Sequence, residues 1–138
     1  MSKKEYNKLT NQEKLTLVRF YSEEAKKDGE LFIRREAYRN LGFTKEALND
    51  KDEYIRLEAY RALGFTKEAK KDKHWTVRLE AYRTLGFTEE ALKDGDYDIR
   101  LQAYRALGFT EEALNDEVSL IRQEAKIYLD FIKLNKKI

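Results

Sequence analysis

A segment of 22 residues recurs along this chain of 138 residues, and the repetition constrains the fold more than any other feature. Its most regular part has 12 residues and runs from Ile55 to Thr66 as Ile-Arg-Leu-Glu-Ala-Tyr-Arg-Ala-Leu-Gly-Phe-Thr, where the Thr already opens the next copy. A unit of this length is too short to bury an apolar face by itself, so the copies must stack to form a core. A Gly-Phe pair closes four copies, at residues 42/43, 64/65, 86/87 and 108/109.

A Ser or Thr opens every copy, and we number this residue position 1. Ser and Thr are preferred helix N-caps, and the Glu at position 3 suits the positive end of a helix dipole. With Ala at position 4, the pattern predicts a first helix of about two turns. An Asp at position 7 marks the junction with the second helix, since Asp is unfavourable inside helices. The five repeats are residues 22–43, 44–65, 66–87, 88–109 and 110–131.

The second helix is predicted from position 9 or 10 to position 20. Positions 12, 16 and 20 hold Ile or Val, Ala and Leu in every copy, and their spacing of four places them on one face of an amphipathic helix. We therefore expect these positions in the core. Gly at position 21 predicts a left-handed residue that ends the helix, and Phe at position 22 predicts a hydrophobic contact across that end.

Residues 1–21 do not follow the repeat, and we expect them to form a cap over the open apolar face of the first repeat. Residues 1–10 are polar and rich in lysine, which favours a frayed end. Thr10 followed by Glu13 is a capping-box pattern, so a helix should begin there. The apolar side of this helix would consist of Leu15, Val18 and Phe20.

The fifth repeat changes in the way that a C-terminal cap does. Asp130 replaces the Gly at position 21, and Lys126 replaces the Tyr at position 17. Without the glycine the last helix should run on to about Leu134, within the tail at residues 132–138. The sequence thus predicts an all-α protein: a right-handed α-solenoid of five two-helix repeats with helical caps, forming one domain over residues 1–138.

Composition narrows the class of protein further. There is no cysteine, which excludes disulfides, thiolate chemistry and cysteine-based metal sites. Charged residues make up 39% of the chain, yet the net charge is only +2, as expected for a solvated helical surface. The first residues lack the apolar core of a signal peptide, and no apolar run approaches the ~20 residues of a membrane span. We expect a cytoplasmic protein.

The Asp at position 7, followed by Ile-Arg, Ala and Leu-Gly in the second helix, resembles the second helix of HEAT-type repeats. The short period is more similar to the leucine-rich repeat variant branch of that group. The resemblance covers residues 22–131. It implies a hydrogen-bonded ladder between neighbouring units, made by the Asp and an Arg six residues later. The matching pairs here are Asp28 and Arg34, Asp50 and Arg56, Asp72 and Arg78, Asp94 and Arg100, and Asp116 and Arg122.

Two rows of side chains on the second helix are candidates for binding. In HEAT-like arrays the second helices line the concave side, so the resemblance implies that the position-18 arginines face an acidic or mixed-charge protein or peptide. The alternative is that they pair with the Glu three residues earlier and keep the surface solvated. The position-17 tyrosines pack between helices or form a strip that receives a peptide. The position-18 arginines are Arg39, Arg61, Arg83 and Arg105.

Positions 8–11 differ most between copies, so specificity is expected there. They supply the aromatic residues Phe32, Tyr54, Trp75 and Tyr97, which are either interface anchors or local packing groups.

One basic-aromatic cluster supports a different function. Lys67, Lys70, Lys71, Lys73, His74 and Trp75 fall together in the third repeat. Lysines could bind phosphates and Trp75 could stack on a base, so nucleic-acid binding is the alternative hypothesis. The repeats on either side hold more acidic than basic residues, which would repel a long polyanion.

Nothing in the sequence indicates catalysis. His74 is the sole histidine, and no catalytic set or metal-ligand pattern surrounds it. We therefore predict a protein that is not an enzyme, has no cofactor or metal, and is a monomer by default. The leading hypothesis is a protein–protein interaction module or scaffold that binds its partner through the concave face and the variable edge. Its candidate partner-binding residues are Arg39, Arg61, Arg83, Arg105, Tyr54, Trp75, Tyr97, His74, Lys71 and Lys73.

Overall fold

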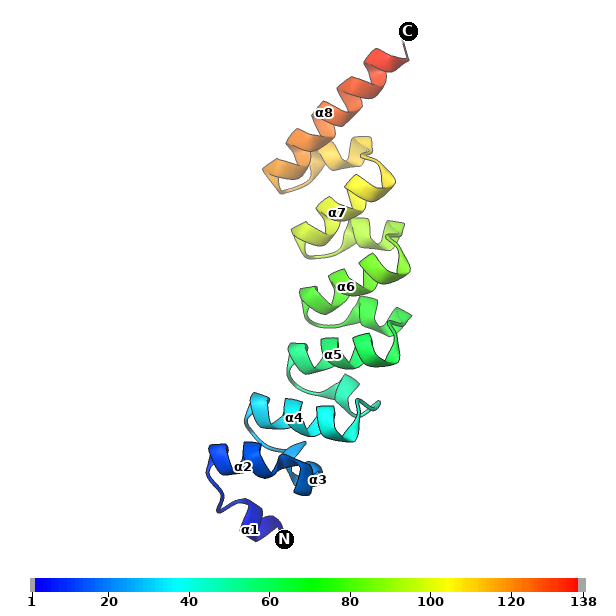
Figure 1. Cartoon of the computed structure of the whole chain (residues 1–138). Helices are drawn as coiled ribbons and strands as arrows, with labels where there is room; N and C mark the ends of the chain where they lie inside the picture. Colours follow the sequence, from blue (N-terminus) through cyan, green and yellow to red (C-terminus); the bar gives the residue numbers. More distant parts are fainter. Residues whose placement is uncertain (1, 137–138) are drawn as a thin grey trace. The chain divides into compact units, whose positions relative to one another are not determined.

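The protein is all-helical in the computed structural model, which describes residues 2–136 apart from the side chain of Lys3 (Figure 1). No strand occurs among these residues. The α-helices are α1 (Lys3–Tyr6), α2 (Asn11–Leu17), α3 (Ser22–Ala25), α4 (Leu31–Leu41), α5 (Glu53–Leu63), α6 (Trp75–Leu85), α7 (Tyr97–Leu107) and α8 (Ser119–Asn135). Short 3₁₀ segments are η1 (Val18–Phe20), η2 (Ala47–Asn49), η3 (Lys67–Lys71), η4 (Glu89–Lys93) and η5 (Glu111–Asn115).

Contacts divide the chain into two compact units, Met1–Phe65 and Thr66–Ile138. The first unit contains α1 to α5, and the second contains α6 to α8. The single domain expected from the sequence stays a prediction.

The predicted second helices are confirmed. Helices α4 to α7 each span 11 residues and cover positions 10 to 20 of their copies, while α8 continues to Asn135. A glycine with positive φ ends each of the four shorter helices, as expected; Gly64, for example, has φ 103° and ψ 139°. The extended ψ differs from the left-handed helical value, so the chain leaves the helix directly along an extended path.

The predicted first helix is present, but in most copies it is a 3₁₀ segment. Copies two to five form 3₁₀ segments of three to five residues, and the first copy forms the four-residue α-helix α3. In η3 the backbone N–H of Asp72 donates to the carbonyl of Ala69, three residues earlier, at 3.2 Å. Asp72 is extended at ψ 144°, which stops the turn before an α-helix can develop. Thr66 starts the turn with its backbone alone, because its side chain makes no capping hydrogen bond.

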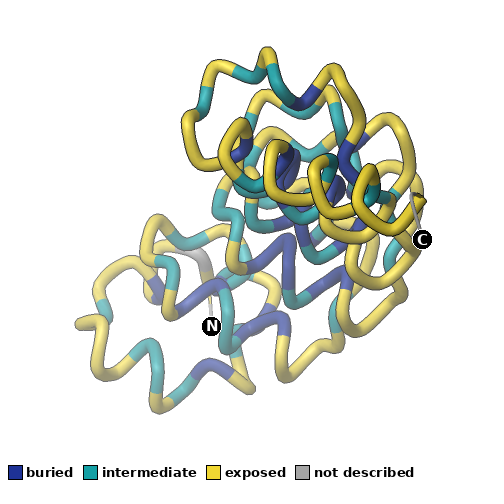
Figure 2. Tube along the Cα trace, turned by 90° about the horizontal axis from the view of Figure 1, so that it is seen from above, coloured by how far each residue is buried: buried dark blue, intermediate teal, exposed yellow. Residues whose placement is uncertain are grey.

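Within each unit, the core lies between a second helix and the copy that follows it. In the second unit, Leu79 and Tyr82 of α6 pack on Ala91, Ile99 and Ala103 of the following copy. These residues hold positions 14 and 17 on one side and 4, 12 and 16 on the other. Positions 12 and 16 are therefore core, as predicted. Figure 2 shows the buried positions as short stretches that recur along the helices, between exposed turns.

One sequence expectation about core positions needs correction, and for the position-17 tyrosines the structure favours the predicted packing between helices over an open strip. The leucines at position 20 are half-exposed, because positions 14 and 17 occupy the contact with the next copy and position 20 lies at the helix end. The tyrosines at position 17 are buried and do not form an open strip. Each stacks on the Phe at position 22 of its own copy, as Tyr104 does on Phe109 with ring centroids 5.4 Å apart and planes 10° apart.

The N-terminal cap covers the first repeat in the way that an interior copy covers its neighbour. Tyr6 and Val18 pack on Ala25, Ile33 and Ala37, which hold positions 4, 12 and 16. Helix α1 and the buried ring of Tyr6 mean that this end is not frayed as predicted. The predicted capping box of α2 is confirmed, with both of its hydrogen bonds present. Its expected apolar side is not fully buried, since the phenylalanine that ends η1 is 64% exposed.

The side of α8 that would face a further copy is polar. Gln123 and Lys126 stand at positions 14 and 17, where other copies have Leu and Tyr, and both are exposed. The same helix packs on the preceding copy through Ile121 and Ala125, which are fully buried. Helix α8 therefore has one face in the core of the second unit and the opposite face in solvent.

The buried alanine at position 16 gives a direct test of this packing. Ala81 is fully buried, so Ala81→Arg should lower the free energy of unfolding by several kcal/mol through overpacking and an unpaired buried charge. Ala106→Arg, on the exposed side of α7, should change it by less than ~0.5 kcal/mol. Urea unfolding followed by circular dichroism measures both, and a similar small effect for the two variants would contradict the assignment.

Candidate functional site: a hollow between α4 and α5

Arginines at position 13 connect neighbouring copies within each unit. In the second unit, Arg78 donates from Nε and Nη2 to the carboxylate of Asp94 at 2.9 and 3.0 Å. Its third nitrogen, Nη1, donates to the backbone carbonyl of Asp72 at 2.9 Å. The Asp six residues earlier thus contributes its backbone, and the carboxylate comes from the following copy. Arg34 with Asp50, and Arg100 with Asp116, repeat this bidentate arrangement at 2.9–3.1 Å.

These pairs are buried, which determines their electrostatics. Hydrogen bonds from Arg100 hold the pKa of Asp116 below its ordinary range, outweighing the effect of burial. The same bonds raise the pKa of Arg100. The side chains of Arg34 and Asp50 are each only 5% exposed. The position-13 arginines in these pairs therefore bind protein carboxylates and are not open to a phosphate or carboxylate ligand.

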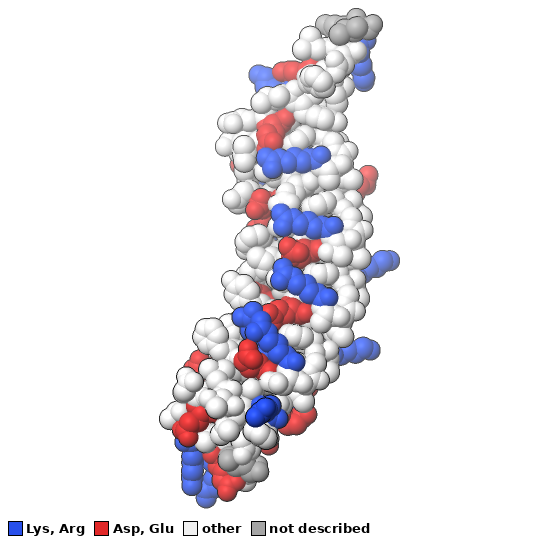
Figure 3. All heavy atoms as spheres, in the orientation of Figure 1, with Lys and Arg blue, Asp and Glu red and all other residues white. Residues whose placement is uncertain are grey.

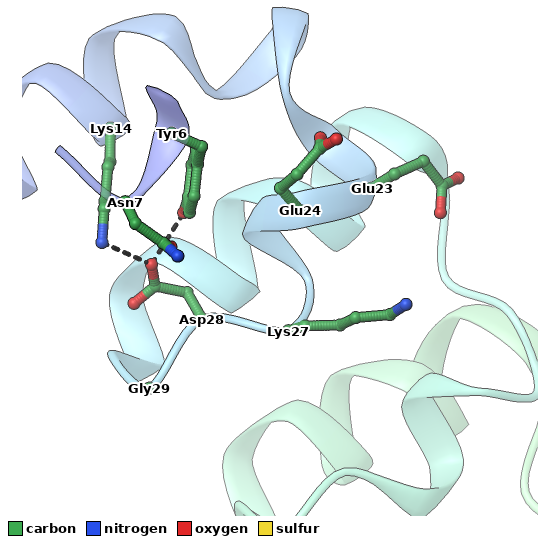
Figure 4. Close-up of a pocket in the computed structure, with 8 residues that line it drawn as sticks. All are labelled: Tyr6, Asn7, Lys14, Glu23, Glu24, Lys27, Asp28 and Gly29. Atoms are coloured by element: carbon green, nitrogen blue, oxygen red, sulfur yellow. Dashed lines mark hydrogen bonds and ion pairs between the residues drawn. The ribbon is translucent and has the colours of Figure 1, made fainter. Parts of the chain in front are cut away.

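The first carboxylate of the series, Asp28, has no preceding repeat and is held by the N-terminal cap. It accepts hydrogen bonds from the Tyr6 hydroxyl at 2.7 Å and the Lys14 ammonium at 2.9 Å (Figure 4). Burial raises the pKa of Asp28, but the Glu30 backbone N–H and these two groups outweigh it and lower the pKa overall. Burial, together with donation to Asp28, raises the pKa of Tyr6. A hollow of about 410 Å³ lies beside these groups, and its central polar groups already bond to one another.

A second series of contacts uses the position-18 arginines. Three of the four bond to position 15 of the following copy: Arg39 to Glu58 at 3.0 Å, Arg83 to Gln102 at 3.0 and 3.2 Å, and Arg105 to Glu124 at 2.8 and 3.1 Å. Acidic and basic side chains consequently alternate along the visible face of each unit (Figure 3). Arg61 differs, because it has no hydrogen bond or ion pair with the described residues of its unit.

Arg61, which has no such partner in its unit, lines a hollow of about 280 Å³ on the first unit. Helix α4 contributes Leu31 and Phe32, and α5 contributes Tyr54 and Leu57. Phe32 is 64% exposed and Tyr54 is 59% exposed, although both are large apolar rings. The hollow therefore combines an apolar floor, two accessible aromatic rings and a free guanidinium.

Arg35 marks the site in the sequence, and sequence analysis did not select it. It stands at position 14, where copies two to four have leucines that are 3–8% exposed. Instead of packing between copies, Arg35 lines the hollow and donates to Glu58 from Nε at 3.0 Å and Nη2 at 2.8 Å. The departure from the Leu that copies two to four have at this position was the signal that could have identified it.

Glu58 gives the wall of the hollow an incomplete set of hydrogen bonds. Its Oε1 accepts from both Arg35 and Arg39, whereas its Oε2 is buried with no hydrogen-bond partner among the described residues. Burial raises the pKa of Glu58, but the hydrogen bonds and charges of the two arginines outweigh it and hold the pKa below its ordinary range. A buried acceptor without a donor costs about 1–3 kcal/mol, so a further donor would be favourable there.

The remaining predicted site residues lie in the second unit, and the structure does not gather them around a hollow. Lys71 and Lys73 are exposed. His74 caps α6 by accepting from the Thr76 N–H at 3.3 Å, and its ring stacks against Trp75. Trp75 and Tyr97 occupy position 10, one residue before the position of Phe32 and Tyr54 in the first unit, and therefore point about 100° away around the helix. Of the predicted residues, the hollow includes Tyr54 and Arg61.

No group of three or more His, Asp or Glu side chains among the described residues could hold a metal ion. Within residues 2–136, no helix has the length and apolar character that a membrane span requires. Comparisons of the chain with protein-family models, with curated proteins and with solved structures find no match. The resemblance to HEAT-type repeats therefore stays a prediction from the residues.

The buried pairs predict how stability depends on pH. Asp116→Asn should cost about 3 kcal/mol at pH 7, because it leaves the buried Arg100 without its counter-charge. The folded state lowers the pKa of Asp116, so the wild type should lose stability as the pH falls below the ordinary carboxyl value of about 4. That loss should be smaller in the variant. Urea unfolding from pH 7 to pH 2 tests this, with Glu111→Gln, at an exposed residue, as control. The same loss of unfolding free energy at low pH in Asp116→Asn and wild type would contradict the prediction.

Proposed function

We propose that this chain is a non-enzymatic, HEAT-like binding protein, a right-handed α-solenoid of five 22-residue repeats that holds a short acidic segment of another protein at the hollow between α4 and α5. One observation carries the proposal: a guanidinium without a partner in its unit, Arg61, stands beside two exposed aromatic rings. The cytoplasmic location expected from the sequence stays a prediction.

The size of the hollow favours a side chain over a small molecule. Its volume of about 280 Å³ lies at the lower end of ligand pockets, which run from about 300 to 1,000 Å³. One apolar side chain of a peptide fits against Leu31 and Leu57, with Phe32 and Tyr54 on either side. Aromatic residues of this kind are common anchors of protein interfaces.

The charges favour an acidic residue next to that apolar side chain. Arg61 offers a planar set of donors that suits a carboxylate, and its pairing would cost no existing bond within the unit. Arg35 and Arg39 already share Glu58, so the hollow retains one net free positive group. These features support a mixed apolar and acidic segment, which fits the partner chemistry expected from the sequence.

Peptide selection tests the proposed function. A phage-displayed random peptide library selected on the full chain should enrich an aliphatic or aromatic residue beside Asp or Glu. Enriched peptides, remade with a fluorescent label and titrated by anisotropy, should lose about 10-fold in affinity, or ~1.4 kcal/mol, with Phe32→Ala and with Arg61→Ala. Arg105→Ala, at the same position of another copy, should have no effect. Peptides that ignore Arg61→Ala would contradict the proposal, and salt-dependent oligonucleotide binding lost with Trp75→Ala would support the nucleic-acid alternative.

Restoring the consensus residue gives a second test. Arg35→Leu should fill the hollow with a side chain that is well buried at the same position of α5 to α7. Burial of a leucine contributes more than this partly exposed ion pair, and Glu58 keeps its bond to Arg39, so the free energy of unfolding should rise by about 1 kcal/mol. Binding of the selected peptides should fall at least 10-fold. Arg83→Leu, at an exposed position, should change neither the free energy of unfolding nor the binding of the peptides. A stabilised Arg35→Leu that still binds at full affinity would show that the hollow is not the site.

A further inference from the structure

Helix α8 carries a row of exposed apolar side chains along its C-terminal half. Ile127 is 70% exposed, Phe131 is 60% exposed and Leu134 is 65% exposed. Their spacing of four and three residues places them on one side of the helix. Ile127 stands at position 18, which is Arg in each of the other four copies, so the row is not part of the repeat pattern.

This apolar row cannot turn inward, because the opposite side of α8 is already packed. Ile121 and Ala125 are fully buried in the core of the second unit. Tyr128 holds the C-terminal half in place, with its ring 5.6 Å from that of Phe109. Figure 1 shows α8 continuing past the end of α7 within this unit. The row is therefore presented on a fixed helix.

A basic row runs beside the apolar row. Arg122, Lys126 and Lys133 share a second side of α8, about 130° around the helix from the first. All three are exposed. Arg122 donates only from Nη1, to the backbone carbonyl of Asp116, so its Nε and Nη2 lack the carboxylate that the corresponding nitrogens of Arg78 and Arg100 bind. Neither lysine forms an ion pair among the described residues.

We infer that this surface docks an amphipathic helix of a partner protein that has an apolar stripe and an acidic flank. Residues of the partner at spacings of three and four would pack on Ile127, Phe131 and Leu134. Its Asp or Glu side chains would meet Arg122, Lys126 and Lys133, which supplies charge complementarity and orientation. The site lies in the second unit and is independent of the hollow between α4 and α5.

Charge argues against a second copy of the chain as the occupant. Two α8 helices packed antiparallel through their apolar rows would bring flanks of the same kind together, so that lysines faced lysines. The three exposed side chains also form a small patch, whereas a stable interface buries about 800 Å² on each partner. A partner helix with acidic residues avoids the repulsion and adds contacts of its own.

Two matched synthetic helices test this inference on the full chain. Both are 18-residue, fluorescein-labelled peptides with leucines at spacings of three and four, and they differ in flanking glutamates or flanking lysines. Anisotropy at low salt should show binding of the Glu peptide at least about 10-fold tighter than of the Lys peptide. Ile127→Arg, which restores the residue of the other four copies, should weaken binding of the Glu peptide at least about 10-fold.

Two control variants distinguish binding at α8 from binding elsewhere on the chain. Leu107→Ser, at a half-exposed leucine of α7, and Arg61→Ala, at the hollow, should leave the affinity for the Glu peptide unchanged. Equal affinity for the two peptides, or full affinity in Ile127→Arg, would overturn the inference. A concentration-dependent dimer in sedimentation that Ile127→Arg abolishes would assign the surface to a second copy instead. Binding to phosphatidylserine vesicles that Ile127→Arg abolishes, without binding of the Glu peptide, would assign it to a lipid surface.

Discussion

The buried guanidinium–carboxylate pair between neighbouring copies is the interaction on which the geometry of each unit depends. Removing two charges from water costs free energy, and here the hydrogen bonds that the guanidinium donates offset this cost. Arg78 bonds to both oxygens of Asp94 and, through its third nitrogen, to the carbonyl of Asp72. The same Asp94 carboxylate accepts the N–H of Asp96, which caps α7. One side chain therefore fixes the end of the 3₁₀ turn, the start of the next helix and the contact with the preceding copy.

A row of such pairs leaves a different problem at each end. At the start, the buried carboxylate of Asp28 has no preceding arginine, and Tyr6 and Lys14 take over its hydrogen bonds and charge. The cap residues must therefore be specific, which explains how a polar N-terminal segment comes to be ordered. At the other end, Arg122 keeps its bond to the carbonyl of Asp116 and is otherwise exposed, because Lys126 and other polar residues replace the apolar neighbours found in interior copies. The N-terminal cap must supply donors to a buried carboxylate, whereas the C-terminal cap must leave a guanidinium in solvent, so the two caps differ in sequence.

Sequence reasoning predicted the elements that depend on local chemistry. The glycines at position 21 and the period of the second helix define α4 to α7, and the lost glycine lengthens α8. It failed where the outcome depends on neighbouring copies. The same residues permit an α-turn or a 3₁₀ turn, and the Asp at its end also bonds to the arginine of the neighbouring copy, a contact that the sequence of one copy does not show. The hollow was missed for the same reason, since Glu58 pairs with Arg35 and Arg39, which lie 23 and 19 residues away.

Departures from the repeat are informative because stacking restricts which residues are allowed at the positions that pack between copies. A position that packs between copies must keep its apolar residue, because otherwise the apolar face of the neighbouring copy is exposed. Arg35 replaces a stacking leucine and leaves a hollow, whereas Ile127 replaces a solvated arginine and leaves an exposed apolar side chain. Neither substitution contributes to the core, and each has a cost in packing or solubility. The two proposed binding surfaces are the places where the chain departs from its own repeat without a structural gain, so binding gives these departures a physical reason.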